Sequence, residues 1–210
     1  TATSAHQVEG GNVNDWSKWE KENAERLAKE ARNYWQPWQQ EKFPEMFSLE
    51  NYISGRACDH YSRYEEDFDI AKLLSHNAHR LSIEWSRVEP EEGKFNEKEI
   101  EHYRAVIRAL RARNMEPFVT LWHWTNPLWI ENIGGWENKK TVEYFLRYAE
   151  KMVRALATDI KFWITLNEPD DIYTFKSYFL GEWPPQQKSF LKTYAVLKNL
   201  IKAHKTVYKV

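Results

Sequence analysis

The segment from Phe162 to Pro169 joins a run of strand-forming residues to groups that can do acid–base chemistry. The apolar run ends abruptly at the amide of Asn167 and the carboxyl of Glu168. Active sites of parallel α/β folds are built where the strands end. Pro169 favours an extended backbone at Glu168, which would present its carboxyl to the site. A carboxyl beside aromatic residues makes a good general acid, because loss of water raises the pKa of a carboxylic acid. The alternative is that Asn167 and Glu168 merely cap the following helix.

Polar side chains also follow the other predicted strands, at the same edge of the expected sheet. Neutral amides and an imidazole exchange hydrogen bonds readily with hydroxyl groups. Taken together, these residues favour a site for a polyhydroxylated ligand. They are Gln7 and Glu9 after the first strand, Arg80, Glu84 and Arg87 within or after the second, and His123, Trp124 and Asn126 after the third.

Each of these residues also has a structural explanation when it is taken singly. Gln7 could bond loop backbone, and a lone histidine such as His123 is more often a satisfied core residue. Two ion pairs would account for the charged members, namely Arg80 with Glu9 and Arg87 with Glu84.

Strand and helix patterns alternate four times along the chain. Apolar residues recur at helical spacing in the helical stretches, and short apolar runs mark the strands. The alternation predicts a parallel sheet built from βα units with right-handed crossovers. The predicted strands are Ala2–Ala5, His79–Trp85, Pro117–Trp122 and Ile160–Leu166, and the helices lie within residues 67–74, 100–110, 142–156 and 189–210.

A long insertion separates the first strand from the first regular helix, at about residues 7–59. The pattern from Ser17 to Glu20 fits a capping box that opens a charged helix over 20–32. Residues 34–55 are aromatic and irregular. A long loop at the active-site edge is usually a wall or lid of the substrate site. No repeat or interdomain linker is apparent, so residues 1–210 are expected to form one unit.

The composition argues against several classes of protein. Lys and Arg number 30 and Asp and Glu 31, so the net charge is −1, too little for a nucleic-acid partner. No apolar stretch is long enough to span a bilayer, and no signal peptide is visible. The single cysteine, Cys58, favours a reducing, cytoplasmic location. No Cys/His cluster, HExxH motif or glycine-rich phosphate loop suggests a metal or another cofactor.

Aromatic residues are unusually abundant, at 15% of the chain with 11 tryptophans. Indole rings at the mouth of a site stack well on the apolar faces of sugars, whereas a single Trp more often fills a core. As a group, the tryptophans at strand ends and in loops support sugar binding. They are Trp85, Trp122, Trp124, Trp136 and Trp183.

An ordered set of motifs resembles glycoside hydrolase family 1, the β-glucosidase and β-galactosidase family. The likeness covers nearly the whole chain and is greatest to the archaeal-type and related bacterial members. The segment Tyr34–Phe47 has no counterpart in the pattern. The motifs are Gln7-Val8-Glu9-Gly10-Gly11, Ala57-Cys58-Asp59-His60-Tyr61, the run from Arg80 to Arg87, the run from Pro117 to Trp124, Gly134-Gly135-Trp136 and the run from Thr165 to Pro169.

The resemblance implies a (β/α)8 TIM barrel and a role for each matching residue. It implies that Glu168 is the general acid/base and that Asn167 bonds the 2-hydroxyl of the sugar. Arg80 would sit beside the catalytic nucleophile and hold that carboxylate ionised. Gln7, His123 and Trp124 would belong to the glycone subsite, and Trp183 would lie near the entrance of the site.

The chain departs from the family pattern in one respect: the glutamate nucleophile of the seventh strand has no counterpart here. Strands 1–4 and helices 1–4 of the barrel are expected, without strands 5–8. Retaining hydrolysis needs two carboxyls about 5–5.5 Å apart. We therefore expect a β-glycosidase that acts on β-glucosides or β-galactosides once a second chain or a symmetry-related copy closes the barrel. A half-barrel that only binds carbohydrate, or one that self-associates, are the alternatives.

Overall fold

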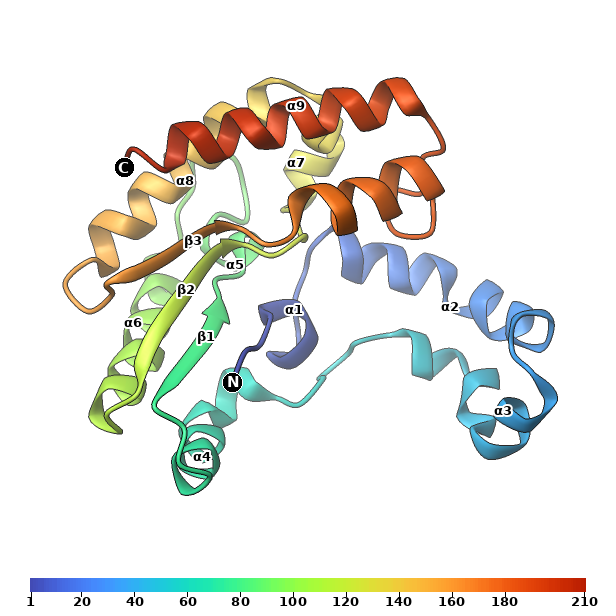
Figure 1. Cartoon of the computed structure of the whole chain (residues 1–210), viewed down its shortest axis with the longest axis horizontal. Helices are drawn as coiled ribbons and strands as arrows, with labels where there is room; N and C mark the ends of the chain where they lie inside the picture. The colour runs from blue at the N-terminus through green and yellow to red at the C-terminus, as the bar shows by residue number, and fades with distance from the viewer.

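The computed structural model describes all residues, 1–210, and shows three parallel strands in the order β1-β2-β3 (Figure 1). The strands are β1 (Ala78–Ser82), β2 (Glu116–Trp122) and β3 (Phe162–Leu166). Three of the four predicted strands are therefore present, although β1 ends at Ser82 rather than at Trp85. Helices lie between the strands, as the alternating pattern predicts.

The predicted first strand is wrong in extent, because only Ala2 forms a bridge, parallel to Arg80. The backbone N–H of Thr3 donates to the Arg80 carbonyl at 2.9 Å, but the next residues turn into the short helix α1 (Ala5–Val8). Side chains replace the ladder there: the Ala5 N–H donates to the Ser82 hydroxyl at 2.7 Å. The first segment thus lies at the β1 edge without becoming a full strand.

The long helices of the βα units cover one face of the sheet, a further long helix belongs to the first loop, and shorter helices build the other loops (Figure 1). Four of the long helices follow the predicted pattern; α4 begins seven residues before the predicted start because His60 already packs against the core residue Phe68. The long helices are α2 (Asp15–Tyr34), α4 (His60–Leu73), α6 (Glu97–Ala112), α8 (Lys140–Leu156) and α9 (Phe190–Val207). The short ones are α3 (Pro37–Lys42), α5 (Trp85–Val88), α7 (Leu128–Asn132), the 3-10 turns Pro44–Phe47, Leu49–Tyr52 and Gly135–Glu137, and a π-helix, Pro169–Leu180.

The strand register separates a buried face from an open one. Leu81 pairs with Val119, and both lie in the main core with the long helices. The neighbouring row of Arg80, Phe118 and Phe162 lies on the opposite face. Phe162 in this row is 46% exposed. The helices therefore cover one face of the sheet, while the other is only partly covered by this chain.

The long first loop contains a helix that starts earlier than the sequence predicts. Asn14, not Ser17, is the N-cap of α2: the Ser17 N–H donates to the Asn14 side chain at 2.8 Å, and the Asn14 N–H donates to the Ser17 hydroxyl at 2.9 Å. Glu20 is used elsewhere, in a bond to His6. In Figure 1, α2 leads away from the carboxyl ends of the strands and carries α3 at its far end.

The segment Tyr34–Phe47, which has no counterpart in the family motifs, lies at this far end. It comprises α3 and a 3-10 turn, and most of its aromatic rings are exposed. Tyr34 is 77% exposed and Trp38 is 61% exposed. The segment is therefore remote from the strand ends and contributes little to the core.

Candidate active site at the carboxyl ends of the strands

Asn167 is the central residue of the predicted site, and its hydrogen bonds join all three strands. Its backbone N–H donates to the Trp122 carbonyl at 3.0 Å. Its side-chain oxygen accepts a hydrogen bond from the Arg80 guanidinium, and Arg80 also donates to the Thr120 hydroxyl at 3.0 Å. Because Asn167 is only 7% exposed and makes these contacts, its amide orientation is fixed. The sequence-predicted residues Arg80 and Asn167 are thus brought together.

Glu168 follows directly but adopts a different backbone from the one expected. Its φ of 39° and ψ of 59° are left-handed rather than extended, because its carbonyl already accepts from Tyr173 at the start of the π-helix. The side chain makes no capping hydrogen bond, so the capping alternative does not hold. The carboxyl lies 3.4 Å from the Asn167 amide nitrogen, and the residue is exposed. This chain alone therefore does not supply the desolvation that was expected at Glu168.

The charge of Glu168 is close enough to act on Arg80. Burial lowers the pKa of Arg80 below its ordinary value, and the Glu168 carboxylate acts in the opposite direction. Arg80 forms no ion pair with any carboxylate in the chain, so the predicted alternative of an Arg80–Glu9 pair is wrong. Glu9 instead binds Arg87 at 2.9 Å. The guanidinium therefore remains available to a further anion.

His123 and Trp124 follow β2 and lie beside this cluster. The Trp124 indole N–H donates to the Asn167 carbonyl at 2.9 Å, and Trp124 has a left-handed φ of 79°. The Nδ1 atom of His123 is buried without a hydrogen-bond partner, so His123 is not the satisfied core histidine of the structural alternative. Burial, helped by the positive charge of Arg80, lowers the pKa of His123 to about 4. Its ring is therefore neutral near pH 7.

Gln7 lies in α1 and is exposed. Its side-chain oxygen accepts a hydrogen bond from the Ser4 hydroxyl at 2.6 Å, so it bonds a side chain rather than loop backbone. No hydrogen bond joins it to His123 or to Asn167. The structure therefore places Gln7 at the same edge of the sheet without connecting it to the cluster around Asn167.

Three tryptophans form an aromatic cluster next to Asn167. Trp124 lies 4.9 Å from Trp183 and is stacked on Trp16, with ring centroids 6.5 Å apart and planes at 22°. Trp16 was missed by the sequence analysis; its place directly after the α2 N-cap region was the available signal. The other predicted tryptophans belong to the core, which corrects the grouping: Trp85, Trp122 and Trp136 are at most 1% exposed.

Glu84 is also structural. It is 1% exposed, and it accepts hydrogen bonds from the hydroxyls of Thr125 at 2.9 Å and Ser86 at 2.8 Å. The alternative that paired it with Arg87 is therefore wrong. Its bond to Thr125 ties the end of β1 to the loop that follows β2.

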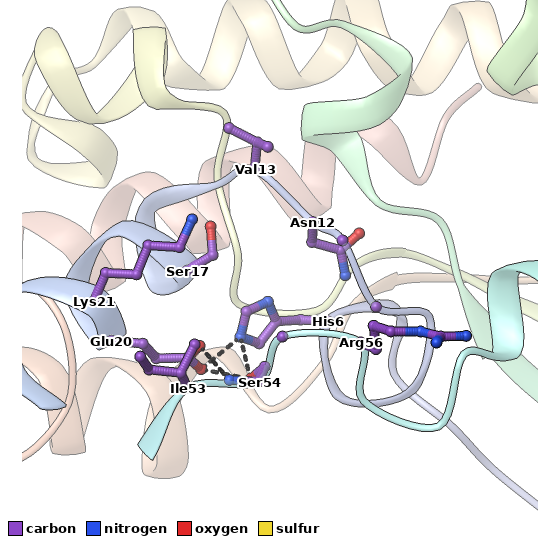
Figure 2. A pocket seen from close by; sticks show the side chains of 12 residues that line it. His6, Asn12, Val13, Ser17, Glu20, Lys21, Ile53, Ser54 and Arg56 are labelled. Carbon is purple, nitrogen blue, oxygen red and sulfur yellow. Dashed lines mark hydrogen bonds and ion pairs between the residues drawn. The ribbon is translucent and has the colours of Figure 1, made fainter. Parts of the chain in front are cut away.

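A polar hollow of about 340 Å³ lies under the first loop, beside α2 (Figure 2). His6 and Glu20 bond each other across it at 2.9 Å, and the Ser54 hydroxyl donates to Glu20 at 2.7 Å. Burial acts to lower the pKa of His6, but the hydrogen bond to Glu20 and the charges of Glu20 and Glu84 outweigh it, so the pKa is raised. The amide of Asn14 bonds the other ring nitrogen, which leaves His6 engaged at both nitrogens. This network holds the first loop together, and His6 packs edge-on against Trp16 of the tryptophan cluster, with ring centroids 6.0 Å apart.

The first loop also requires a glycine where it passes close to itself. Gly10 has a φ of 81°, and a Cβ there would lie 2.1 Å from the Arg56 carbonyl oxygen. Gly10 therefore allows two distant parts of the loop to pack directly. No group of three or more His, Cys, Asp or Glu side chains is placed to hold a metal ion, and no helix has both the length and the apolarity needed to cross a membrane.

The parallel strands and the helices between them form part of a TIM barrel. The family model "Glycosyl hydrolase family 1" matches residues 1–210, and the chain belongs to that family. It is 35% identical over 155 residues to a 1,4-beta-D-glucan glucohydrolase of Thermotoga neapolitana, a match that covers 73% of this chain and 36% of that protein. It is 34% identical over 216 residues to Beta-glucosidase 42 of Arabidopsis thaliana, covering 100% of this chain and 40% of that protein.

Solved structures show the same relation. A beta-glycosidase from Pyrococcus horikoshii superposes with a TM-score of 0.83 at 38% identity, covering 100% of this chain and 43% of that one. A beta-glucosidase from Thermotoga maritima in complex with deoxynojirimycin gives a TM-score of 0.83 at 28% identity, covering 99% and 44%. The chain thus spans less than half the length of the relatives it matches, and its fold is a partial barrel.

Proposed function

We propose that residues 1–210 form the acid/base half of a retaining β-glycosidase that hydrolyses terminal β-D-glucosyl or β-D-galactosyl residues. The observation that carries the proposal is the hydrogen-bonded cluster of Arg80, Asn167 and Glu168 at the carboxyl ends of three parallel strands, in a chain of this family. Glu168 is the general acid, which protonates the departing glycosidic oxygen, and then the base, which activates the incoming water.

The orientation of the Asn167 amide suits a hydrogen bond from its nitrogen to the substrate. Its oxygen is occupied by Arg80, whereas its nitrogen has only the long contact of 3.4 Å to Glu168. Asn167 is therefore assigned as a hydrogen-bond donor to the sugar 2-hydroxyl. A hydrogen bond at this hydroxyl strengthens as the oxocarbenium-like transition state forms, which accelerates the reaction.

Arg80 is assigned to support the nucleophile. It is partly buried and has no carboxylate partner among the residues described, while retaining hydrolysis requires a second carboxyl near Glu168. An incoming carboxylate at Arg80 would be held ionised and therefore nucleophilic. This carboxylate is proposed to come from the C-terminal half of the barrel, supplied by the same polypeptide, a second chain or a symmetry-related copy.

The glycone is proposed to contact Gln7, His123 and Trp124. The unpartnered Nδ1 of His123 and its neutral ring suit a hydroxyl, because a neutral imidazole offers one donor and one acceptor. Trp124 adds an apolar face for stacking. The exposed, unpaired Cys58 agrees with a reducing, cytoplasmic location, which is likewise proposed.

The decisive experiment uses an assembled enzyme, here defined as residues 1–210 joined to the C-terminal half of a family 1 β-glycosidase. We expect it to cleave an aryl β-glucoside with retention, as followed by NMR of the first-formed anomer. Glu168→Gln should lose most activity toward cellobiose and much less toward an activated aryl glycoside in the glycosylation step, because general acid help matters most for poor leaving groups.

Azide provides the second arm of this experiment. Glu168→Ala leaves room for azide, which should restore part of the turnover by replacing the base-assisted water. Glu182→Gln, which removes another exposed carboxylate from the same half, is the matched control and should behave as the parent. Normal cellobiose hydrolysis by Glu168→Gln would show that the acid/base assignment is wrong.

A further inference from the structure

We propose that Asp15 is a positioning residue of this site, which locks the long first loop onto the loop after β2 and so fixes Trp124 against Asn167. The catalytic part of the inference rests on the proposed function; the structural part does not. Asp15 lies 111 residues away from its partner Asn126 in the sequence, so the lock joins two loops that the strands alone do not hold together.

Asp15 and Asn126 form a reciprocal set of three hydrogen bonds. The Asp15 backbone N–H donates to the Asn126 carbonyl at 3.0 Å. The Asn126 backbone N–H donates to Asp15 Oδ1 at 2.8 Å, and the Asn126 amide donates to Asp15 Oδ2 at 2.7 Å. Oδ1 also accepts from the Trp16 N–H at 2.9 Å. Both carboxylate oxygens are therefore used, and Asn126 is only 2% exposed.

Two routes connect this pair to the proposed catalytic residues. In the first route, the Asn126 side chain accepts a hydrogen bond from the Trp122 indole N–H at 3.0 Å. This bond closes the turn in which Trp124 adopts its left-handed conformation. Along the second, Trp16 follows Asp15 directly and stacks on Trp124. Trp124 then donates to the Asn167 carbonyl at 2.9 Å. A loosened Asp15–Asn126 pair would therefore release Trp124, and with it the backbone beside Glu168.

The pair is held by hydrogen bonds rather than by an opposite charge. Asp15 has no lysine or arginine partner, and burial raises its pKa to about 7 although the Asn126 N–H groups act to lower it. An amide at position 15 would avoid the cost of a buried charge. It could not, however, accept from Asn126 at both atoms, because one of them would be an NH₂ group. The geometry thus needs one carboxylate and one amide, in either order.

A swap of the two side chains tests this requirement. In Asp15→Asn, the new NH₂ group faces the NH₂ of Asn126; in Asn126→Asp, two carboxylates face each other. The double variant Asp15→Asn/Asn126→Asp matches every donor again, since the amide now at position 15 can donate to the carboxylate at position 126, which still accepts from Trp122. We expect each single variant to lower kcat/KM of the assembled enzyme by roughly 10- to 100-fold, the scale of a misplaced contact. The swap should restore it to within about threefold.

A second readout does not require activity. In the assembled enzyme labelled with ¹⁵N-tryptophan, we expect the indole N–H of Trp124 to exchange with solvent faster in each single variant and at the parent rate in the swap. The indole of Trp129, which donates to the Glu89 carbonyl at 2.9 Å, is the internal control and should not change. Glu89→Gln is the control variant: Glu89 is fully buried and paired with Arg147, so its loss should lower Tm without affecting Trp124 exchange.

The two readouts separate this inference from the proposed function. If the parent assembled enzyme shows no glycosidase activity, the proposed function fails, while the exchange measurement still decides the role of Asp15. Unchanged Trp124 exchange in both single variants would overturn the positioning role, even if Tm falls. A swap that misfolds, or that folds but remains as defective as the single variants, would overturn it as well, because every donor of the pair is matched there and only the long 3.4 Å contact of position 126 to the Trp124 carbonyl is lost.

Discussion

At the scale of single residues, Asn167 connects the strand ends to one another, in addition to its proposed contact with the sugar. Its backbone and side chain form hydrogen bonds with residues of β1, β2 and the loop after β2. The position of Asn167 therefore depends on the register of all three strands. Glu168 follows without an intervening residue, and its left-handed backbone ends the extended strand conformation there. The proposed acid/base is therefore positioned mainly by its backbone, and its carboxyl has only the long 3.4 Å contact to the Asn167 amide.

The glycone assignment leads to a prediction for Gln7 and His123. Each alanine variant should lower kcat/KM of the assembled enzyme by about tenfold or more, the loss of one hydrogen bond in the transition state, while the thermal melt hardly changes. Gln7 is exposed and His123 lacks an internal partner at Nδ1, so neither supports the fold strongly. Gln36→Ala, which removes an exposed amide far from the site, is the control. An equal loss of stability and activity would instead favour a structural role.

The same assignment has a consequence for pH. Because the pKa of His123 is lowered to about 4, its ring stays neutral from pH 5 to 8 and does not titrate there. His123→Asn should therefore lower kcat/KM at every pH in this range and leave the midpoints of the profile unchanged. A shifted acid midpoint in this variant would show that His123 carries a proton in the active form.

The residue types at the site could be predicted from the sequence, but their partners could not. Strand-end position pointed to Asn167 and Glu168, because carboxyl ends of parallel strands meet at one edge. Arg80 lies within β1, and its proximity to Asn167 comes from the structure. The ion pairs offered as structural alternatives, Arg80 with Glu9 and Arg87 with Glu84, are wrong, since charge alone does not say which side chains share a face. Glu9 pairs with Arg87, and Glu84 bonds hydroxyl groups instead. Trp16 was missed because its contact with Trp124 depends on how a long loop folds back.

At the scale of elements, the local sequence pattern predicts helices and strands well only where side chains do not compete with the backbone for its hydrogen bonds. The β2 and β3 strands and α6, α8 and α9 lie close to their predicted positions. The prediction of the first strand is wrong because the Ala5 N–H donates to the Ser82 hydroxyl instead of to a strand carbonyl, and the chain continues as α1. The predicted capping box at Ser17 is wrong because the side-chain oxygen of Asn14, three residues upstream, accepts from the Ser17 N–H.

Strand β1 contains a buried histidine whose titration should destabilise the fold in acid. His79 is 4% exposed, and burial, with smaller contributions from the nearby His60, N-terminal amine and His76, lowers its pKa to about 4. Between pH 6.5 and 4 the unfolded chain binds the proton more tightly, so this contribution to stability is complete above pH 6.5 and is lost as the pH falls from there to 4.

The test compares the unfolding free energy of the parent and of His79→Gln in the assembled enzyme, at pH 7.5 and pH 5.0. The drop on acidification should be smaller in the variant by up to about 2 kcal/mol. Comparison of the two proteins removes the contributions of other groups, including Glu9 and Asp15, whose raised pKa values act in the opposite direction. Equal drops in both proteins would contradict the assignment.

At the scale of the whole molecule, one face of the sheet is covered by helices and the other only in part. Leu81 and Val119 face a core of 31 buried residues, but Phe162 on the opposite face is 46% exposed. Beyond β3, Phe175 and Phe179 stack on each other at 5.0 Å and are both more than 40% exposed. Parallel sheets normally have both faces covered, so this apolar surface is expected to meet further protein.

The isolated 210-residue chain should therefore be inactive and should not remain a compact monomer. It contains Glu168 but no matching nucleophile, and the Arg80 guanidinium has no carboxylate partner. The unpaired edge of β3 favours association with another chain. We expect it to dimerise, aggregate or fold loosely in size-exclusion chromatography with light scattering, and to show no turnover of an aryl β-glucoside.

Addition of a separate chain that carries strands five to eight should restore a compact particle and retaining hydrolysis together. The restored activity should require Glu168 on this chain, since Glu168→Gln mixed with the same partner remains inactive toward cellobiose. A complementing chain with its nucleophile replaced by Gln should restore the compact particle without activity, which separates assembly from chemistry. A purified monomer of residues 1–210 that cleaves the aryl glycoside would overturn this account, because the second carboxyl would then have to lie within these strands.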